Sequence, residues 1–211
     1  MEYLWLNKKQ NDKLIVFFNG WGMDDKSVNF LEFGKYDVIM FYDYRNLSSV
    51  DFDFGAYKSK FIVSWSTGVF ISNLFFDKLH DAEMKIALNG TLNPVDDEFG
   101  IPVNIYNLTV NNFNALSCKK FIKRMFAGEE IPVLSDRTVE ELKQELISIR
   151  DCRIDKCFSF DKAVISENDK IIPSKNQHNF WDSRNNVQVK KIQGGHYPFL
   201  NFRSWDDILN A

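Results

Sequence analysis

Ser66 has the sequence context of a catalytic nucleophile. It lies within Ser-Trp-Ser-Thr-Gly at residues 64–68, where an apolar, strand-forming run ends and a helical pattern begins. A sharp turn between a strand and a helix, the nucleophile elbow, holds a serine hydroxyl clear of a sheet. The two backbones approach closely there, so the positions two before and two after the serine must be small, and Ser64 and Gly68 are small. Serine and glycine are common in turns, so the prediction also requires a base and an acid.

A base for this serine is expected at His196, within Gly-Gly-His-Tyr-Pro at residues 194–198. The two glycines allow a loop tight enough to aim an imidazole at Ser66. An unperturbed histidine pKa of about 6.5 suits a group that takes and returns a proton near neutral pH. Lone histidines are usually structural or exposed, but one that follows a strand and comes last in chain order fits the role of the base.

The acid is expected at Asp169, which follows a short strand-like run. Its carboxylate would accept a hydrogen bond from the His196 ring, set the tautomer and stabilise the imidazolium. The pattern Asp-x-x-x-Pro at residues 169–173 leads from a strand end into a helix, and this favours Asp169. Glu167 and Asp43 are alternatives; otherwise Asp43 makes a loop hydrogen bond and Glu167 is a solvated charge.

Two backbone amides are expected to stabilise the oxyanion of the reaction. The N–H of Thr67 follows the nucleophile at the start of a helix, where the helix dipole favours negative charge. The second donor should come from a loop after an earlier strand. Asn-Gly-Trp-Gly at residues 19–22 follows such a strand, and its glycines allow the loop to fold over the serine. We predict Trp21 as the second donor; the alternative is a plain glycine turn.

The elements that must position these residues alternate between strands and helices. Near-continuous apolar runs predict strands covered on both faces of a parallel sheet, and a short N-terminal segment predicts an antiparallel edge strand. The order serine, acid, histidine, each after a strand, is that of α/β-hydrolases. We predict an α/β-hydrolase fold with a mostly parallel sheet flanked by helices. The expected strands are residues 3–6, 14–18, 38–42, 61–63, 86–88, 163–165 and 187–192, with a helix over 67–80.

A helical insertion interrupts this alternation at residues 104–156. One helical stretch lies near residues 113–126, and a second near 136–150 has apolar residues at three- and four-residue spacing. A helical segment after a strand can cover a pocket at the carboxyl ends of the strands as a lid. The alternative is two ordinary crossover helices. We expect a single domain over residues 1–211 with this lid inside it.

Composition excludes several classes of protein. The chain has 211 residues and a net charge of −3, so its overall field does not favour nucleic acid. No apolar run is long enough to cross a bilayer, and the N-terminus does not read as a secretory signal. Cys118, Cys152 and Cys157 are odd in number and lack metal-type spacing, which fits a reducing cytoplasm. We expect a cytoplasmic protein with no metal, no cofactor and no membrane partner.

These motifs resemble a particular family, the BioG-type pimeloyl-[acyl-carrier protein] methyl ester esterases of biotin synthesis. The resemblance covers most of the chain except the helical interval. Asn-Gly-Trp-Gly and Ser-Trp-Ser-x-Gly together are fairly specific to this group, whereas other α/β-hydrolases more often have His-Gly and Gly-x-Ser-x-Gly. The motifs are residues 17–23, 41–45, 63–69, 87–91 and 195–199.

The resemblance implies hydrolysis of the methyl ester of pimeloyl-acyl carrier protein, with release of methanol and without a cofactor or metal. Ser66 would attack the ester carbonyl and His196 would accept its proton. Two other functions stay open. One is a carboxylesterase or thioesterase for free small acyl esters, and the other is a hydrolase-like protein that only binds a ligand or partner.

A basic cluster in the predicted lid bears on the partner. Lys119, Lys120, Lys123 and Arg124 fall within ten residues that include no acid. On a helix, the last three share one face and the first lies beside them. Acyl carrier proteins are acidic, so this face would steer one by charge complementarity; the alternative is a solvated helix face. Nearby phenylalanines, of which we expect most to pack in the core, could line an acyl tunnel: Phe113, Phe121 and Phe126.

Overall fold

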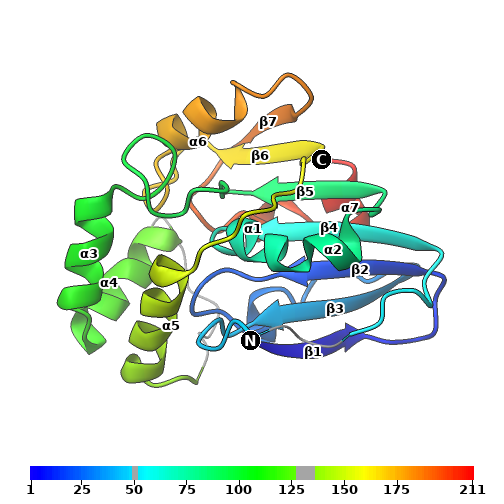
Figure 1. Cartoon of the computed structure of the whole chain (residues 1–211), viewed down its shortest axis with the longest axis horizontal. Helices are drawn as coiled ribbons and strands as arrows, with labels where there is room; N and C mark the ends of the chain where they lie inside the picture. Colours follow the sequence, from blue (N-terminus) through cyan, green and yellow to red (C-terminus); the bar gives the residue numbers. More distant parts are fainter. Residues whose placement is uncertain (49–51, 127–135) are drawn as a thin grey trace.

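The computed structural model describes residues 1–48, 52–126 and 136–211. Within these ranges seven strands form one sheet in the order β1-β3-β2-β4-β5-β6-β7 (Figure 1). Neighbouring strands are parallel, except that β1 pairs with β3 in the antiparallel direction. The strands are β1 (Glu2–Asn7), β2 (Lys13–Phe18), β3 (Tyr36–Tyr42), β4 (Ser59–Trp65), β5 (Met84–Leu88), β6 (Lys162–Ser166) and β7 (Gln188–Ile192).

All the strands predicted from the sequence are present, including the antiparallel edge strand. The apolar run of β2 explains why such strands form, since successive side chains enter different cores. Ile15 and Phe17 belong to the hydrophobic cluster on one face of the sheet, and Val16 and Phe18 belong to the cluster on the other. All four are fully buried.

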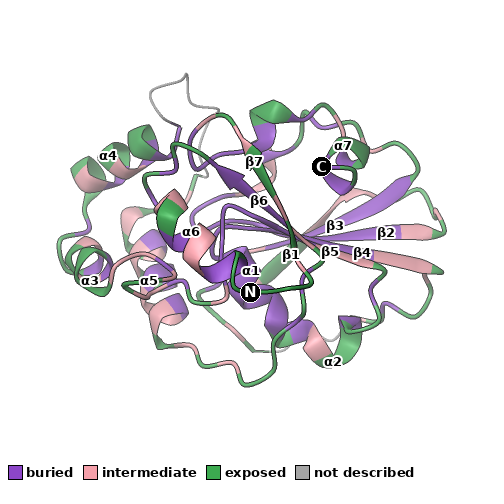
Figure 2. Cartoon of the chain, turned by 90° about the horizontal axis from the view of Figure 1, so that it is seen from above, coloured by how far each residue is buried: buried purple, intermediate pink, exposed green. Residues whose placement is uncertain are grey.

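Helices cover both faces of this sheet. Figure 2 shows α1, α2 and α6 on one side and α7 on the other. The helix predicted over residues 67–80 is interrupted, because a 3₁₀ segment (Ser72–Phe75) separates α1 from α2. The helices outside the predicted lid are α1 (Gly68–Ile71), α2 (Phe76–Leu79), α6 (Ser174–Trp181) and α7 (Trp205–Leu209).

Three further helices lie together beyond the carboxyl ends of the parallel strands (Figure 1). They are α3 (Val103–Asn111), α4 (Ala115–Met125) and α5 (Val139–Asp151). The sequence predicted only the last two. Asn114 and Thr138 each form a capping box at the start of α4 and α5, which fixes where these helices begin. These three helices therefore lie over the carboxyl ends of the strands, where the loops with the predicted catalytic residues begin.

Candidate active site

The turn after β4 has the geometry of a nucleophile elbow. Ser66 has φ +57°, a left-handed conformation that is uncommon for a residue with a side chain. Its N–H donates to Leu88 O on β5 at 2.9 Å, which holds the turn against the sheet. A Cβ on Gly68 would lie 2.3 Å from Phe18 O, and one on Gly90 would lie 2.3 Å from Ser66 O. Glycine at both positions is therefore a steric requirement of the turn.

The structure brings Ser66, His196 and Asp169 together from three loops. Ser66 Oγ lies 2.7 Å from His196 Nε2, and His196 Nδ1 lies 2.7 Å from Asp169 Oδ2. All three residues are buried, with His196 only 1% exposed. A carboxylate oxygen accepts, so His196 Nδ1 carries the proton and Nε2 is the acceptor for the Ser66 hydroxyl. This arrangement can deprotonate the serine as it attacks an electrophile.

Asp169 is held by more than the histidine. Its Oδ1 accepts the N–H groups of Ile171 and Ile172 at 2.8 and 3.1 Å, and its Oδ2 also accepts Gln177 Nε2 at 2.7 Å. The carboxylate is thus fixed at the start of the loop that leads into α6.

The two alternative acids lie elsewhere. Glu167 is exposed and accepts a hydrogen bond from Gln193. Asp43 pairs with Arg45, their closest atoms 2.6 Å apart, and lies near Arg137. Burial raises the pKa of Asp43, but these two guanidinium groups outweigh it and bring the pKa below its usual value. Neither carboxylate has a hydrogen bond to His196, so the geometry selects Asp169 as its partner.

Asn89 holds the histidine loop, a role that the sequence did not reveal. Its Nδ2 donates to His196 O at 2.9 Å and to Ser166 Oγ at 2.7 Å, and its Oδ1 accepts Ser166 N–H at 2.7 Å. Trp65 Nε1 donates to the same His196 carbonyl at 2.9 Å. These contacts join the ends of β4, β5 and β6 to the histidine. Asn89 lies in a motif directly after a strand, and this position in the sequence could have marked it as a candidate site residue.

The two predicted oxyanion donors lie beside Ser66, but one of them is engaged. Trp21 N–H donates to Thr67 Oγ1 at 3.0 Å. The Thr67 hydroxyl therefore has to turn away before the Trp21 amide can meet another acceptor. Gly20 packs so closely on the Trp65 ring that a Cβ would lie 2.9 Å from it, which keeps the loop over the elbow.

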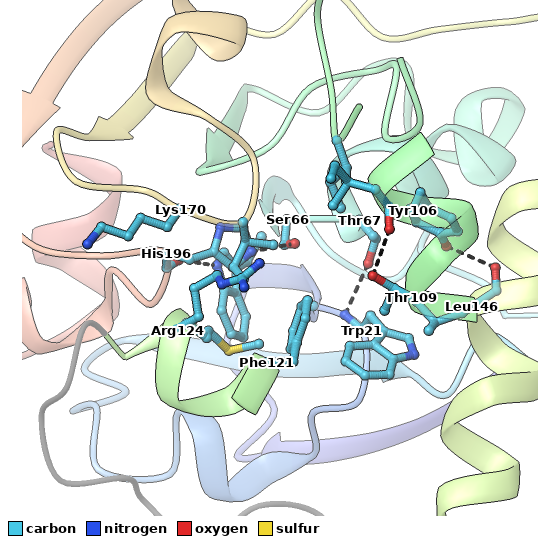
Figure 3. Close-up of a pocket in the computed structure, with 16 residues that line it drawn as sticks. Trp21, Ser66, Thr67, Tyr106, Thr109, Phe121, Arg124, Leu146, Lys170 and His196 are labelled. Atoms are coloured by element: carbon cyan, nitrogen blue, oxygen red, sulfur yellow. Dashed lines mark hydrogen bonds between the residues drawn. The ribbon is translucent and has the colours of Figure 1, made fainter. Parts of the chain in front are cut away.

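A largely apolar pocket of about 610 Å³, open mouth included, leads to these groups (Figure 3). The helices α3, α4 and α5 form one wall, and the elbow and the loops that follow β2, β6 and β7 form the other. Phe121 lines the pocket, whereas Phe113 packs edge-on against the Trp21 ring and Phe126 packs against Tyr197. The lining residues are Gly20, Trp21, Trp65, Ser66, Thr67, Ile101, Ile105, Tyr106, Thr109, Phe121, Arg124, Met125, Leu146, Lys170, Ile171 and His196.

Cations meet this pocket at its rim. Lys119, Lys120, Lys123 and Arg124 are all exposed on α4, and Arg124 also lines the pocket. Lys170 also lines it, from the loop after β6 (Figure 3), and was not predicted. It directly follows Asp169, and a search of the residues around the acid would have found it.

The described part of the chain contains no group of three or more histidine, cysteine, aspartate or glutamate residues that could hold a metal ion. Over the same residues no helix has the length and apolar character needed to cross a membrane. The three cysteines are not in disulfides.

Comparison with known proteins places the chain in a family. A protein-family profile described as "Pimeloyl-ACP methyl esterase BioG" matches residues 1–208. This chain belongs to the BioG family. A Haemophilus influenzae protein described as uncharacterized is 34% identical over 209 aligned positions, and the match covers 94% of this chain and 95% of that protein. The resemblance inferred from the motifs is thereby confirmed.

A second relative is longer. A malonyl-[acyl-carrier protein] O-methyltransferase of Bacteroides fragilis is 36% identical over 195 residues, 87% of this chain. The chain spans only 39% of the length of that relative.

Solved structures confirm the α/β-hydrolase fold. The crystal structure of BioG from H. influenzae matches with a TM-score of 0.87 and 32% identity, and the match covers 99% of both chains. A putative aryl esterase from Burkholderia cenocepacia has the same fold, with a TM-score of 0.66 and 12% identity over 94% of this chain and 88% of the other. The BioG family and this fold identify the chain as a hydrolase of the esterase type.

Proposed function

We propose that this member of the BioG family is a serine carboxylesterase that hydrolyses the methyl ester of pimeloyl-acyl carrier protein. The products are pimeloyl-acyl carrier protein and methanol, and the reaction would serve biotin synthesis. The observation that carries the proposal is the chain of 2.7 Å contacts from Ser66 Oγ through His196 to Asp169 at the floor of an apolar pocket. The family description names the same substrate.

The geometry supports a two-step reaction. Ser66 Oγ attacks the ester carbonyl carbon while His196 Nε2 takes the hydroxyl proton, and Asp169 holds the other ring nitrogen. The amides of Thr67 and Trp21 stabilise the tetrahedral oxyanion once the Thr67 hydroxyl has turned away. The C–O bond to the methoxy group then breaks, and methanol leaves with the proton from His196.

Water completes the cycle. His196 removes a proton from a water molecule that attacks the acyl-Ser66 carbonyl, and the serine leaves with that proton, which restores the free enzyme. The largely apolar walls of the pocket suit the methylene chain of a pimeloyl group, because burial of each CH₂ contributes about 0.8 kcal/mol.

The partner is proposed to dock on the helical interval 104–156, which we propose to act as a lid. The exposed cations of α4 continue into the pocket through Arg124. Leu116 on α4 and Leu108 on α3 are 63% and 58% exposed and add apolar surface nearby. An acidic carrier protein with a phosphorylated arm complements such a surface. The B. fragilis relative is named for O-methylation of a carrier-bound acyl group. The proposed hydrolysis would remove a methyl group of this kind from a carrier-bound acyl group.

The test is methanol release from purified pimeloyl-acyl carrier protein methyl ester, measured beside the free monomethyl ester. We expect the carrier-bound ester to have the higher kcat/KM, and we expect Ser66→Ala to lose at least ~10³-fold in kcat while its melting temperature stays close to wild type. Equal kcat/KM on both esters would favour a general carboxylesterase. No methanol from either ester would favour a binding protein.

A further inference from the structure

Glu145 is a charged residue in a position where a charge is costly. It lies on α5 and is completely buried. Burial raises the pKa of its carboxyl, and the guanidinium of Arg137, 2.9 Å away, acts in the opposite direction. Buried ion pairs rarely stabilise a fold more than apolar residues of similar volume would. Stability alone therefore does not explain this pair.

Three donors converge on the two oxygens of Glu145. Oε1 accepts Tyr44 N–H at 2.9 Å, and Oε2 accepts Gly22 N–H at 3.1 Å and a guanidinium N–H of Arg137 at 2.9 Å. Two of these donors are backbone amides of the loops that follow β2 and β3. Gly22 has φ +76° and directly follows Trp21, whose amide is a proposed oxyanion donor. One carboxylate thus joins α5 to both loops.

Helix α5 holds the same loop at a second point. Leu142 O accepts the indole N–H of Trp21 at 2.9 Å. Leu142 and Glu145 are three residues apart and so lie on one face of the helix. At the other end of the loop, Tyr44 Oη donates to Asn19 O at 2.7 Å. The Trp21 amide therefore sits between anchored groups on both sides.

We propose that Glu145 is a positioning residue for the oxyanion hole, which fixes the Trp21 amide by holding the amide of Gly22 to α5. The proposal rests on the proposed function of Ser66 and Trp21. It assigns the innermost lid helix a part in the chemistry in addition to covering the pocket.

The donor arrangement explains why a carboxylate is needed. Each of the three groups that hydrogen-bond to Glu145 donates, and a carboxylate offers only acceptors. Glutamine at this position would turn its NH₂ group toward either Tyr44 N–H or Gly22 N–H. One backbone amide would then lose its acceptor, and the loop would shift to find another.

The experiment compares Glu145→Gln with Asp43→Asn. Asp43 also faces Arg137, at 3.4 Å, but accepts no hydrogen bond from residues 19–22 in the structure, so its change to asparagine perturbs the same charge cluster without removing an acceptor from that loop. The readouts are kcat and KM on a small aryl ester, and thermal unfolding. We expect E145Q to lower kcat about 10²-fold with KM within about twofold, as for loss of one oxyanion donor. D43N should keep kcat within about twofold.

A second variant separates positioning from stability. In E145L/R137L both charges are gone, so no unpaired charge is buried and the fold should survive. We expect kcat to remain about 10²-fold low because Gly22 N–H still lacks its acceptor. Wild-type kcat in this double variant, in which Gly22 N–H has no acceptor in either orientation, would overturn the proposal, as would equal losses in E145Q and D43N. The aryl ester reports on Ser66 chemistry without a carrier, so failure to hydrolyse the carrier-bound ester would contradict only the proposed substrate.

Discussion

At Ser66 the backbone holds a conformation that costs of the order of 1–2 kcal/mol for an ordinary residue. The hydrogen bond to Leu88 and the close packing of Gly68 and Gly90 maintain it. The result is a hydroxyl that points away from the sheet toward His196. Strain at this residue is therefore part of how the proposed nucleophile is presented.

Asp169→Asn tests the role of the acid at the scale of single residues. Asparagine has one acceptor oxygen, so it cannot accept from all four donors that meet this side chain. Its NH₂ group would face either the two backbone N–H groups that Oδ1 accepts or the side chains of Gln177 and His196. An NH₂ group facing His196 would favour the wrong ring tautomer. We expect kcat on an aryl ester to fall by about 10³–10⁴-fold with KM little changed. A loss of less than tenfold would show that His196 does not depend on this carboxylate.

Residues with a local signature could be predicted from the sequence. The serine, acid and histidine each follow a strand and lie in small, glycine-rich or proline-linked motifs, so Ser66, Asp169 and His196 were found. Glu145 has no such signature, and Asn89 has only its position directly after a strand. Their roles come from contacts with residues about 77 to 123 positions away, which only the folded chain brings together.

Among the elements, strands were easier to predict than helices. Most strands coincide with continuous apolar runs, which predict buried strands with little ambiguity, and every predicted strand is present. Helix α3 was missed because its sequence, VNIYNLTVN, alternates apolar and polar residues and is rich in β-branched side chains, which is typical of a strand. Tertiary packing decides the outcome: Tyr106 is buried and donates its hydroxyl proton to Leu146 O on α5 at 2.9 Å.

Asp37 offers a test of stability at the end of the sheet opposite the site. Its buried carboxylate accepts hydrogen bonds from Lys9 N–H, from Asn11 and from Tyr57 Oη. Burial alone would raise the pKa of Asp37, but these hydrogen bonds lower it overall. We expect Asp37→Asn to lose about 2 kcal/mol of unfolding free energy at pH 7, measured by urea denaturation, with kcat unchanged.

The sign of the pH effect follows from the lowered pKa. The stabilising contribution of the Asp37 carboxylate is present above its unfolded value of 3.8 and is lost as pH falls through the lower folded value. The gap in stability between wild type and D37N should therefore narrow below about pH 4. A gap that stays constant down to pH 2 would show that the hydrogen bonds do not depend on the charge.

The cations of α4 provide a second test at this scale. We expect Lys119→Gln/Lys120→Gln/Lys123→Gln to lower kcat/KM for the carrier-bound ester about tenfold at low salt, because charge steering is lost. Turnover of a small aryl ester should stay at the wild-type level. Arg124 is left in place because it lines the pocket.

The matched control removes the same charge from other parts of the surface. Lys175, Lys190 and Lys191 are exposed on α6 and β7, and their replacement by glutamine should leave both substrates unaffected. Equal losses of carrier-bound activity in the two triple variants would mean that net charge matters and the α4 face does not.

In the molecule as a whole, the candidate site and the exposed cations of α4 lie at the same end of the sheet. The loops at the carboxyl ends carry the proposed catalytic residues, and the three helices beyond them line the pocket, with exposed cations on α4 (Figure 1). The net charge of −3 does not reveal this local cluster of positive charge on α4. A basic face on an acidic protein favours one docking orientation for an acidic partner, and added salt should weaken that preference.

The most direct test of the central claim is covalent labelling by a serine-directed phosphonate, with the modified peptide identified by mass spectrometry. We predict one adduct on Ser66 in the wild-type protein, none in Ser66→Ala, and labelling slowed at least ~10²-fold in His196→Ala. An adduct on a different residue, or equal labelling rates in wild type and His196→Ala, would contradict the claim that His196 activates Ser66.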